Sequence, residues 1–380
     1  MTHGLVIGKF YPPHRGHHGL IRQAAGEVDR LSVVVMGSTA ESIPIEDRLG
    51  WMRATHAAEA NVTVAAIKCD SPVDIDDPNV WKAQVAAIEA GARLCNGEPV
   101  DVVFSCEGYG DELASRIGAA HRRCERTDWL SATAVRSDPL GHWADLAPAT
   151  RAGLAFRLVI VGAESTGKSR LALALAEHYR SLGGAWASTQ LVDGHGSDFG
   201  AREIGGEPAA PLSPGRPGPA GSRTEWTVTD FDRVARRQAE REESAAAGGS
   251  PVLVSEGDPF STSVWERRWL GTAARRHPGY ARAPLLARRD LYLVTEPEGV
   301  GSSEGDRRDG QGGAASAMTR QFIDALSEAG HSWVLLSGTE SERLALAVRA
   351  AQPLIERRLN FADPRRGPGF GPTPSSPPQP

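Results

Sequence analysis

The stretch GAESTGKS at residues 162–169 decides the fold of the second half of this chain. It matches the pattern G-x-x-x-x-G-K-[ST], an apolar run at residues 158–161 leads into it, and a helical pattern at residues 168–179 follows. In such a turn the backbone N–H groups surround phosphates, Lys168 reaches the β and γ oxygens, and the Ser169 hydroxyl binds Mg²⁺. The sequence therefore predicts a P-loop, although this motif alone does not separate kinases, ATPases and GTPases.

A second phosphate-binding motif, GKFYPPHRGH, lies at residues 8–17 and also follows an apolar strand pattern. Its H-x-G-H part places His14 and His17 at the start of the next helix, where N–H groups and the helix dipole favour an anion. Gly16 permits close approach of the backbone. Such a site suits in-line attack of one phosphate on another, for which a protein supplies position and charge neutralisation. The alternative is a helix cap with incidental histidines.

The stretch SATAVR at residues 131–136 is a candidate companion to this motif. It puts the hydroxyls of Ser131 and Thr133 and the guanidinium of Arg136 on a turn that enters a helix. Alone, S-x-T is a common N-cap. Downstream of H-x-G-H, it is a candidate second phosphate clamp.

Composition narrows the class of protein. The 380 residues are 40% hydrophobic and carry a formal net charge of −5, which does not favour a protein that coats nucleic acid or a membrane surface. We find no apolar run that could span a bilayer and no signal peptide, and expect a cytoplasmic protein. The four cysteines lack metal-ligand spacing and are expected to be unpaired thiols. Of only four lysines, Lys9 and Lys168 lie in the two phosphate motifs.

Strand and helix patterns alternate through both halves, which predicts α/β domains with parallel sheets. We expect a first domain at residues 1–150, a second at 154–363, and a disordered Pro/Gly-rich tail at 364–380. Residues 205–221 and 299–313 are rich in glycine with proline or charge, and are expected to be flexible insertions.

The motifs resemble those of a known family. GKFYPPHRGH is similar to the G-x-F-x-P-x-H-x-G-H signature of nucleotidylyltransferases, and SATAVR is similar to their S-x-T-x-x-R signature. More closely, the first motif, IEDRL at 45–49 with Trp51, and Val80-Trp81 resemble the NadR-type bifunctional enzymes, over roughly residues 4–363 without the insertions.

This resemblance implies a Rossmann-like nucleotidylyltransferase domain followed by a P-loop NTPase-fold kinase domain. The first domain would join nicotinamide mononucleotide to the adenylyl group of ATP, giving NAD and pyrophosphate. The second would phosphorylate nicotinamide riboside with ATP and Mg²⁺.

The resemblance also implies roles in the first domain. His14 and His17 would hold the ATP phosphates and stabilise the transition state. Asp47 and Arg48 would contact substrate, and Trp81 would stack on the cationic nicotinamide ring. Without the family, Trp81 reads as a core or interface aromatic. The expected phosphate contacts are Gly8, Lys9, Phe10, Gly16, Ser131, Thr133 and Arg136.

In the second domain, Lys168 would be catalytic, Asp258 would take the proton of the substrate hydroxyl, and Ser169 with Glu256 would bind the metal. The alternative for the two acidic residues is a solvated strand end. Arginines at 307, 308 and 320 match a lid that meets the transferred phosphoryl group, or else lie on a flexible surface loop. The expected ATP contacts are Gly162, Glu164, Ser165, Thr166, Gly167, Arg307 and Arg320.

One departure bears on the kinase. Where the family has an acid, a tyrosine and an arginine that meet the riboside, this chain has Gly194, His195 and Ser197. Serine does not replace a bidentate arginine. Two alternatives therefore stay open: an adenylyltransferase with a nucleotide-sensing P-loop domain, and a superfamily member with another phosphate substrate such as phosphopantetheine. We expect small-molecule substrates, no specific DNA binding and no membrane partner, while a homo-oligomer is compatible with the sequence.

Overall fold

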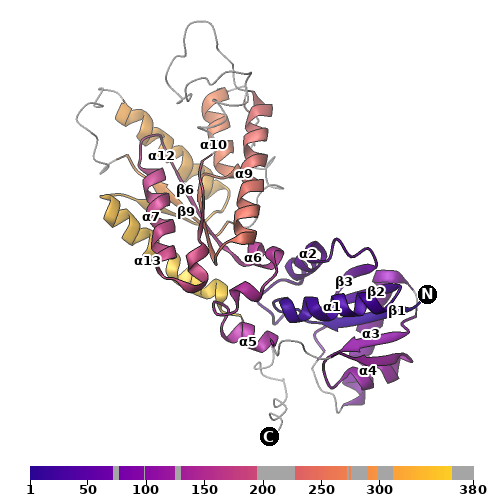
Figure 1. Cartoon of the computed structure of the whole chain (residues 1–380). Coiled ribbons are helices and arrows are strands. Elements are labelled where there is room, and N and C mark those ends of the chain that lie inside the picture. Colours follow the sequence, from indigo (N-terminus) through magenta and orange to yellow (C-terminus); the bar gives the residue numbers. More distant parts are fainter. Residues whose placement is uncertain are drawn as a thin grey trace. The chain divides into compact units, whose positions relative to one another are not determined.

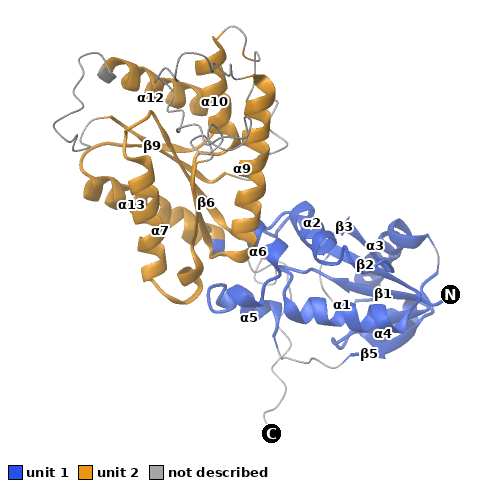
Figure 2. Cartoon of the chain, turned by 45° about the horizontal axis from the view of Figure 1, so that its top comes forward, with its two compact units in different colours: residues 1–153, 359–380 blue, residues 154–358 orange. Residues whose placement is uncertain are grey.

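The computed structural model describes residues 1–71, 77–97, 99–124, 130–194, 227–271, 274, 289–297 and 311–361. The chain forms two compact units (Figures 1 and 2). Unit 1 comprises Met1–Gly153 together with the segment that starts at Leu359, and unit 2 comprises Leu154–Arg358.

Unit 1 is built around a five-stranded sheet of order β3-β2-β1-β4-β5 in which all described pairings are parallel. Helices lie on both faces of this sheet (Figure 1). Its elements are β1 (His3–Gly8), α1 (Arg15–Glu27), β2 (Arg30–Gly37), α2 (Ile45–Thr55), β3 (Val62–Lys68), α3 (Pro78–Asn96), β4 (Val102–Ser105), α4 (Gly110–Ile117), β5 (Ala120–Arg123), α5 (Ala132–Ser137), the 3-10 turn η1 (Trp143–Asp145) and α6 (Pro148–Leu154).

The two faces of this sheet bury two separate apolar clusters, because successive side chains of a strand point to opposite sides. Val33 and Val35 pack with α1 and α2 residues such as Ile21 and Met52. Val34, between them, packs into the cluster that includes Ile88 of α3 and Leu113 of α4. The central strands are therefore mostly apolar, as parallel strands covered on both faces are, and buried His3 of β1 and Ser32 of β2 are hydrogen-bonded to each other at 2.7 Å.

Unit 2 has a second five-stranded parallel sheet, of order β10-β9-β6-β8-β7. All seven residues of β6 are buried. The elements are β6 (Phe156–Gly162), α7 (Lys168–Ser181), η2 (Gly184–Ser188), β7 (Gln190–Val192), α9 (Val228–Gly248), β8 (Val252–Glu256), α10 (Pro259–Leu270), β9 (Leu291–Thr295), α12 (Gln311–Glu328), β10 (Trp333–Leu336) and α13 (Glu340–Leu359).

Both phosphate motifs lie where the central strand of a sheet ends and a helix begins. The chain leaves β1 for α1, and leaves β6 for α7. In each sheet the later strands pair on the other side of that central strand, with β4 beside β1 and β9 beside β6. Such a reversal of strand order opens a crevice at the carboxyl ends of the strands, where α/β proteins bind ligands.

The prediction of α/β units with parallel sheets is confirmed. Strands β5 and β7 had no sequence signal, because one reads Ala-His-Arg-Arg and the other has only three residues. The four cysteines form no disulfide bond. Residues 205–221, 299–310 and the tail at 364–380 lie outside the described part, whereas residues 311–313 belong to α12. None of the described helices is long and apolar enough to cross a membrane.

The end of α13 differs from the expected domain limits. The sequence placed residues up to 363 in the second domain, but the segment from Leu359 belongs to unit 1. The reason is an aromatic contact. The ring of Phe361 packs edge-on against that of Tyr11, with 6.2 Å between centroids, and Phe361 is only 8% exposed.

A pair of buried histidines lies beneath α1. His18 is 3% exposed, and its Nδ1 is 2.9 Å from Nε2 of His56. Burial, together with the neighbouring His56, Arg22 and His14, lowers the pKa of His18 to about 3. A neutral ring can share one proton with its partner across this contact, whereas two charged rings would repel each other.

We predict that unit 1 loses stability as the pH falls below 6.5. An unfolded histidine binds a proton near pH 6.5, and buried His18 does not until about pH 3. The stabilisation is complete above 6.5 and is lost progressively on acidification, by about 2 kcal/mol at pH 5. Urea titrations at pH 7 and 5, with hydrogen–deuterium pulses at constant pH on α1 peptides, measure this loss. His18→Leu should flatten the dependence, and His142→Gln, a half-exposed histidine, should not; an unchanged slope in His18→Leu would refute the assignment.

Candidate functional site

The first site begins with the two imidazoles at the start of α1. His14 is the N-cap of this helix, and its Nδ1 accepts a hydrogen bond from the backbone N–H of Gly16 at 3.2 Å. Nδ1 of His17 accepts from the backbone N–H of His14 at 3.3 Å. Because Nδ1 accepts in both rings, a neutral ring carries its proton on Nε2. The capping box thus fixes both tautomers with the proton on Nε2. His17 is half-exposed, whereas His14 is 2% exposed and its Nε2 is buried, so His17 is the more accessible donor for a phosphate oxygen.

Close packing explains the glycines of this motif. The rings of His14 and His17 lie 3.7 Å apart between centroids, and Phe10 meets His17 edge-on at 5.0 Å. A Cβ on Gly16 would lie 3.1 Å from Cε1 of His14, and a Cβ on Gly8 would lie 3.1 Å from the ring of Phe10. Any side chain at these positions would displace the aromatic rings that form the loop.

The structure brings the S-x-T-x-x-R stretch to the H-x-G-H loop. Arg136 donates from Nη1 to the carbonyl oxygen of Tyr11 at 2.9 Å and from Nη2 to Oγ1 of Thr133 at 3.2 Å. Ser131 caps α5 by accepting from the backbone N–H of Ala134 at 3.1 Å. Arg136 therefore fastens the two motifs together.

Arg48 holds the same loop from inside the protein. Its side chain is fully buried; it donates to the carbonyl oxygens of Lys9 at 2.5 Å and Met36 at 3.3 Å, and to the Glu41 carboxylate at 2.6 Å. Lys9 pairs with the other oxygen of Glu41 at 3.1 Å. Burial lowers the pKa of Arg48, and Glu41 opposes this shift. In this geometry Arg48 positions the loop rather than contacting substrate, while Asp47 is exposed on the first turn of α2.

Trp81 also differs from its expected role. The sequence led us to expect a ring that stacks on nicotinamide. In the structure Trp81 is 5% exposed and packs in the apolar cluster of Leu5, Val34 and Ile88. The Arg116 guanidinium lies over its ring at 5.6 Å. This is the core placement that the sequence left open as the alternative.

In unit 2, the P-loop has the backbone that its sequence predicts. Gly162 and Gly167 have φ values of 151° and 82°, which favour glycine, and Ser165 is also left-handed at 57°. A Cβ on Gly162 would lie 2.4 Å from Oγ1 of Thr295, so this glycine also permits contact with β9. Residues 165–170 line an open cavity of about 330 Å³.

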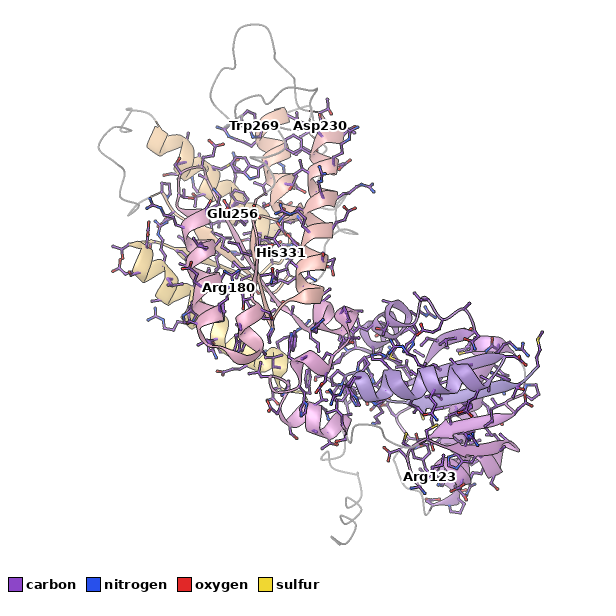
Figure 3. The ribbon with its side chains drawn as sticks, viewed as in Figure 1. Arg123, Arg180, Asp230, Glu256, Trp269 and His331 are labelled. Atoms are coloured by element: carbon purple, nitrogen blue, oxygen red, sulfur yellow. The ribbon has the colours of Figure 1, made fainter. Side chains whose placement is uncertain are left out.

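The polar groups of this loop converge. Lys168 donates from Nζ to the carbonyl oxygen of Ala163 at 2.6 Å, and the Ser169 hydroxyl donates to Oε1 of Glu256 at 3.0 Å. Glu256, labelled in Figure 3, is the last residue of β8. Strand β8 pairs directly with β6. Burial lowers the pKa of Lys168, and Glu256 and Glu164 oppose this shift. Burial raises the pKa of Glu164. An anion bound beside Lys168 would stabilise the charged ammonium group, which burial disfavours.

Arg343 of α13, which sequence reasoning missed, plays the part that Arg48 plays in unit 1. It is 3% exposed and donates to three carbonyl oxygens, those of Thr166 at 2.8 Å, Glu296 at 2.9 Å and Gly338 at 2.9 Å. Thr166 Oγ1 meets Oγ1 of Thr295 at 2.6 Å. The P-loop is thus tied to the ends of β9 and β10. An arginine in an amphipathic helix carries no sequence signal for this role.

The structure contradicts the expected role of Asp258. This residue is 1% exposed and is the N-cap of α10. Its Oδ1 accepts from the backbone N–H of Ser261 at 2.7 Å, and its Oδ2 accepts from Tyr292 at 2.7 Å and from Arg289 at 3.1 Å. Arg289 also pairs with buried Glu242. With both oxygens held by protein donors, Asp258 is a buried structural carboxylate, not an open general base.

The remaining expected contacts are only partly described. Gly194 lies beside β8, since a Cβ on it would be 3.1 Å from the Glu256 carbonyl oxygen. The preceding Asp193 is exposed and pairs with Arg241 at 2.6 Å. Arg320 is exposed on α12. The expected lid arginines Arg307 and Arg308 lie outside the described residues, as do His195 and Ser197 of the altered stretch.

We predict that Arg48→Met destabilises unit 1 by about 3–5 kcal/mol, because it leaves the buried Glu41 carboxylate without its guanidinium partner. Urea titration with peptide-level hydrogen–deuterium pulses measures this loss separately for each unit. Arg22→Met removes an arginine that is 56% exposed and paired with Glu59, and should cost less than about 1 kcal/mol. Equal losses in the two variants would show that Arg48 does not hold the loop.

The comparisons with known proteins agree with both units. A family model described as an AAA domain matches residues 157–343, within unit 2. In sequence the chain is similar to the trifunctional NAD biosynthesis/regulator protein NadR of Salmonella typhimurium, at 23% identity over 86% of this chain and 76% of that protein. The Escherichia coli protein of the same name is 22% identical over 86% and 77% of the two chains.

Two solved structures share the fold along most of the chain. One is described as NadR protein in complex with NR, with a TM-score of 0.61 and 19% identity, and the other as NadR protein in complex with NAD and AMP-PNP, with a TM-score of 0.59 and 20% identity. Each covers 92% of this chain and 95% of its own. This chain therefore has an α/β architecture with a P-loop NTPase-like second unit, and is similar to NadR proteins in sequence and fold.

Proposed function

We propose that this chain makes NAD in two steps, phosphorylation of nicotinamide riboside in unit 2 and adenylylation of the resulting mononucleotide in unit 1. The observation that supports the proposal is that one chain carries two strand-to-helix loops whose side chains suit phosphate by different chemistry. One presents imidazole donors fixed by a capping box, and the other presents a P-loop lysine. The likeness to proteins named for NAD biosynthesis supports this pairing.

In unit 1, a phosphate oxygen of the mononucleotide would attack the α-phosphorus of ATP. A bond forms between that oxygen and the α-phosphorus, the bond from the α-phosphorus to the bridging oxygen breaks, and pyrophosphate leaves with the electron pair. His14 and His17 donate from Nε2 to phosphate oxygens and stabilise the charge that develops. Arg136, which holds the loop through Tyr11, keeps these donors in place.

In unit 2, the hydroxyl of the riboside would attack the γ-phosphorus of ATP, and ADP leaves. Lys168 and the loop N–H groups bind the phosphates. The hydroxyl proton would pass to an oxygen of the transferred phosphoryl group, because both oxygens of buried Asp258 are held by protein donors and Glu256 is assigned to the metal. Ser169 and Glu256, 3.0 Å apart, are oxygen ligands of the kind that Mg²⁺ takes. When bound there, Mg²⁺ neutralises phosphate charge.

A second candidate is an adenylyltransferase whose P-loop unit senses nucleotide without phosphorylating a riboside. The burial of Asp258 favours it, as does Gly194 where the resembling family has an acid. The contact between Ser169 and Glu256 suits Mg-ATP binding in both candidates, so product analysis rather than this contact separates them.

We predict that substitutions at the two sites separate the two steps. His17→Ala should slow dinucleotide formation by about 10²–10³-fold through loss of one phosphate donor, and should accumulate mononucleotide from riboside. Lys168→Ala should stop mononucleotide formation and spare NAD formation from added mononucleotide. Mass analysis of products from riboside or mononucleotide with Mg-ATP reads out both steps.

Lys82→Ala serves as the control, because this lysine is exposed on α3 and should leave both steps unchanged. Loss of both activities in either His17→Ala or Lys168→Ala, with both units folded, would exclude the two-site assignment. NAD from mononucleotide but none from riboside in the unsubstituted protein would favour the sensing alternative.

A further inference from the structure

A serine, a histidine and an aspartate form a hydrogen-bonded relay at the carboxyl end of β4. Nδ1 of His121 on β5 is 2.7 Å from Oδ1 of Asp111 on α4, and its Nε2 is 3.0 Å from Oγ of Ser105. A carboxylate only accepts, so Nδ1 carries a proton, and in a neutral ring Nε2 accepts from the Ser105 hydroxyl. The carbonyl oxygen of Glu107 is a second, longer acceptor for that hydroxyl at 3.3 Å.

These contacts have the order found in a hydrolase triad, but the serine has no room for a substrate. Ser105 is 3% exposed. Gly110 covers it so closely that a Cβ there would lie 2.1 Å from Oγ of Ser105 and 2.2 Å from Nε2 of His121. A carbonyl group could not reach the hydroxyl. The relay instead fixes the two ends of residues 106–110 to β5.

The segment held in this way lies at the crevice of unit 1. Strand β4 pairs with β1, with Leu5 opposite Val103, so the two strands end at the same edge of the sheet. The chain enters the His14 loop after β1 and residues 106–109 after β4. These two loops flank the point where the strand order reverses, which is where α/β sheets bind ligands.

Charge indicates which part of a ligand this segment meets. Residues 106–109 read Cys-Glu-Gly-Tyr, with the Glu107 carboxylate and no cation, while the Asp111 carboxylate is paired with His121. Glu107 is exposed, and Tyr109 packs partly against the cluster beneath α3 and α4. A wall of this composition repels phosphate and suits the cationic, aromatic end of a mononucleotide. The phosphates would meet the opposite wall, at the start of α1.

We infer that His121 is a positioning residue. It holds residues 106–109 in place as a latch, and these residues form the wall of the crevice that binds the base of the mononucleotide. This inference rests on the proposed adenylyl transfer in unit 1. The relay acts on binding of the mononucleotide and takes no part in the transfer of the adenylyl group. Loss of the latch should therefore weaken ground-state and transition-state binding equally, which raises the Michaelis constant and leaves the turnover number unchanged.

The test uses His121→Asn in the full chain, with steady-state kinetics of NAD formation from mononucleotide. Asparagine can still donate to Asp111 but is too short to reach Ser105. We expect the Michaelis constant for the mononucleotide to rise about tenfold. The turnover number and the Michaelis constant for ATP should stay within about twofold of the values for the unsubstituted protein. Arg122→Gln is the matched control, since Arg122 is the next residue of β5 and pairs with Glu27, and it should change none of these values.

Hydrogen exchange of residues 106–109 gives a readout that needs no activity. It should quicken in His121→Asn and in Ser105→Ala, and not in Arg122→Gln. A fall in turnover number with an unchanged Michaelis constant would indicate general destabilisation and overturn the inference. So would unchanged exchange, or covalent labelling of Ser105 by a fluorophosphonate. If the unsubstituted protein formed no NAD but the exchange rates changed as expected, the proposed function and the assigned ligand would be refuted. The hold of His121 on residues 106–109 would still stand.

Discussion

Both phosphate loops depend on one kind of interaction, a buried arginine that donates to backbone carbonyl oxygens. Arg48 binds the carbonyls of Lys9 and Met36 in unit 1, and Arg343 binds that of Thr166 and two others in unit 2. A guanidinium has five donors in a planar fork, which suits several acceptors at once. In unit 1 the backbone N–H groups of His14 and Gly16 are taken by the two imidazoles, so ring N–H groups rather than these backbone groups would meet an anion.

The two sites share this contact between an arginine and backbone carbonyls, but they differ in the side chains at the start of the helix. In unit 1 the helix start carries imidazoles, whose neutral Nε2–H groups can donate without bringing a full charge. In unit 2 the helix start carries Lys168 beside Ser169 and Glu256, a cation next to oxygen ligands. The first arrangement suits transfer at an α-phosphorus with pyrophosphate leaving, and the second suits transfer of a γ-phosphoryl group.

Much of the backbone of the two phosphate loops could be predicted from local sequence patterns. A glycine-rich turn between an apolar strand and a helix has few possible conformations, so Gly162 and Gly167 could be placed from their spacing alone. The failures involve side chains whose surroundings come from distant residues. Asp258 has the sequence of a metal or base site, yet Pro259 and Ser261 make it a helix cap, and Arg289 and Tyr292 occupy its second oxygen.

The same limit of prediction, that distant residues decide a side chain's surroundings, applies to Arg48, Trp81 and His121. Their types suggest ligand contact, but burial of the first two is set by the packing of the sheet on α2 and α3. His121 lies on a polar four-residue strand that no pattern predicts, and its partners come from β4 and α4. Sequence reasoning thus predicts the backbone of a phosphate site more readily than the side chains that hold it.

The central claim is that one chain carries two separate nucleotide phosphate sites. Calorimetric titration with a non-hydrolysable ATP analogue and Mg²⁺, in the absence of acceptor, tests it most directly. The account predicts two molecules bound per chain, falling to one in Lys168→Ala. A single molecule bound to the unsubstituted chain at saturation would contradict it.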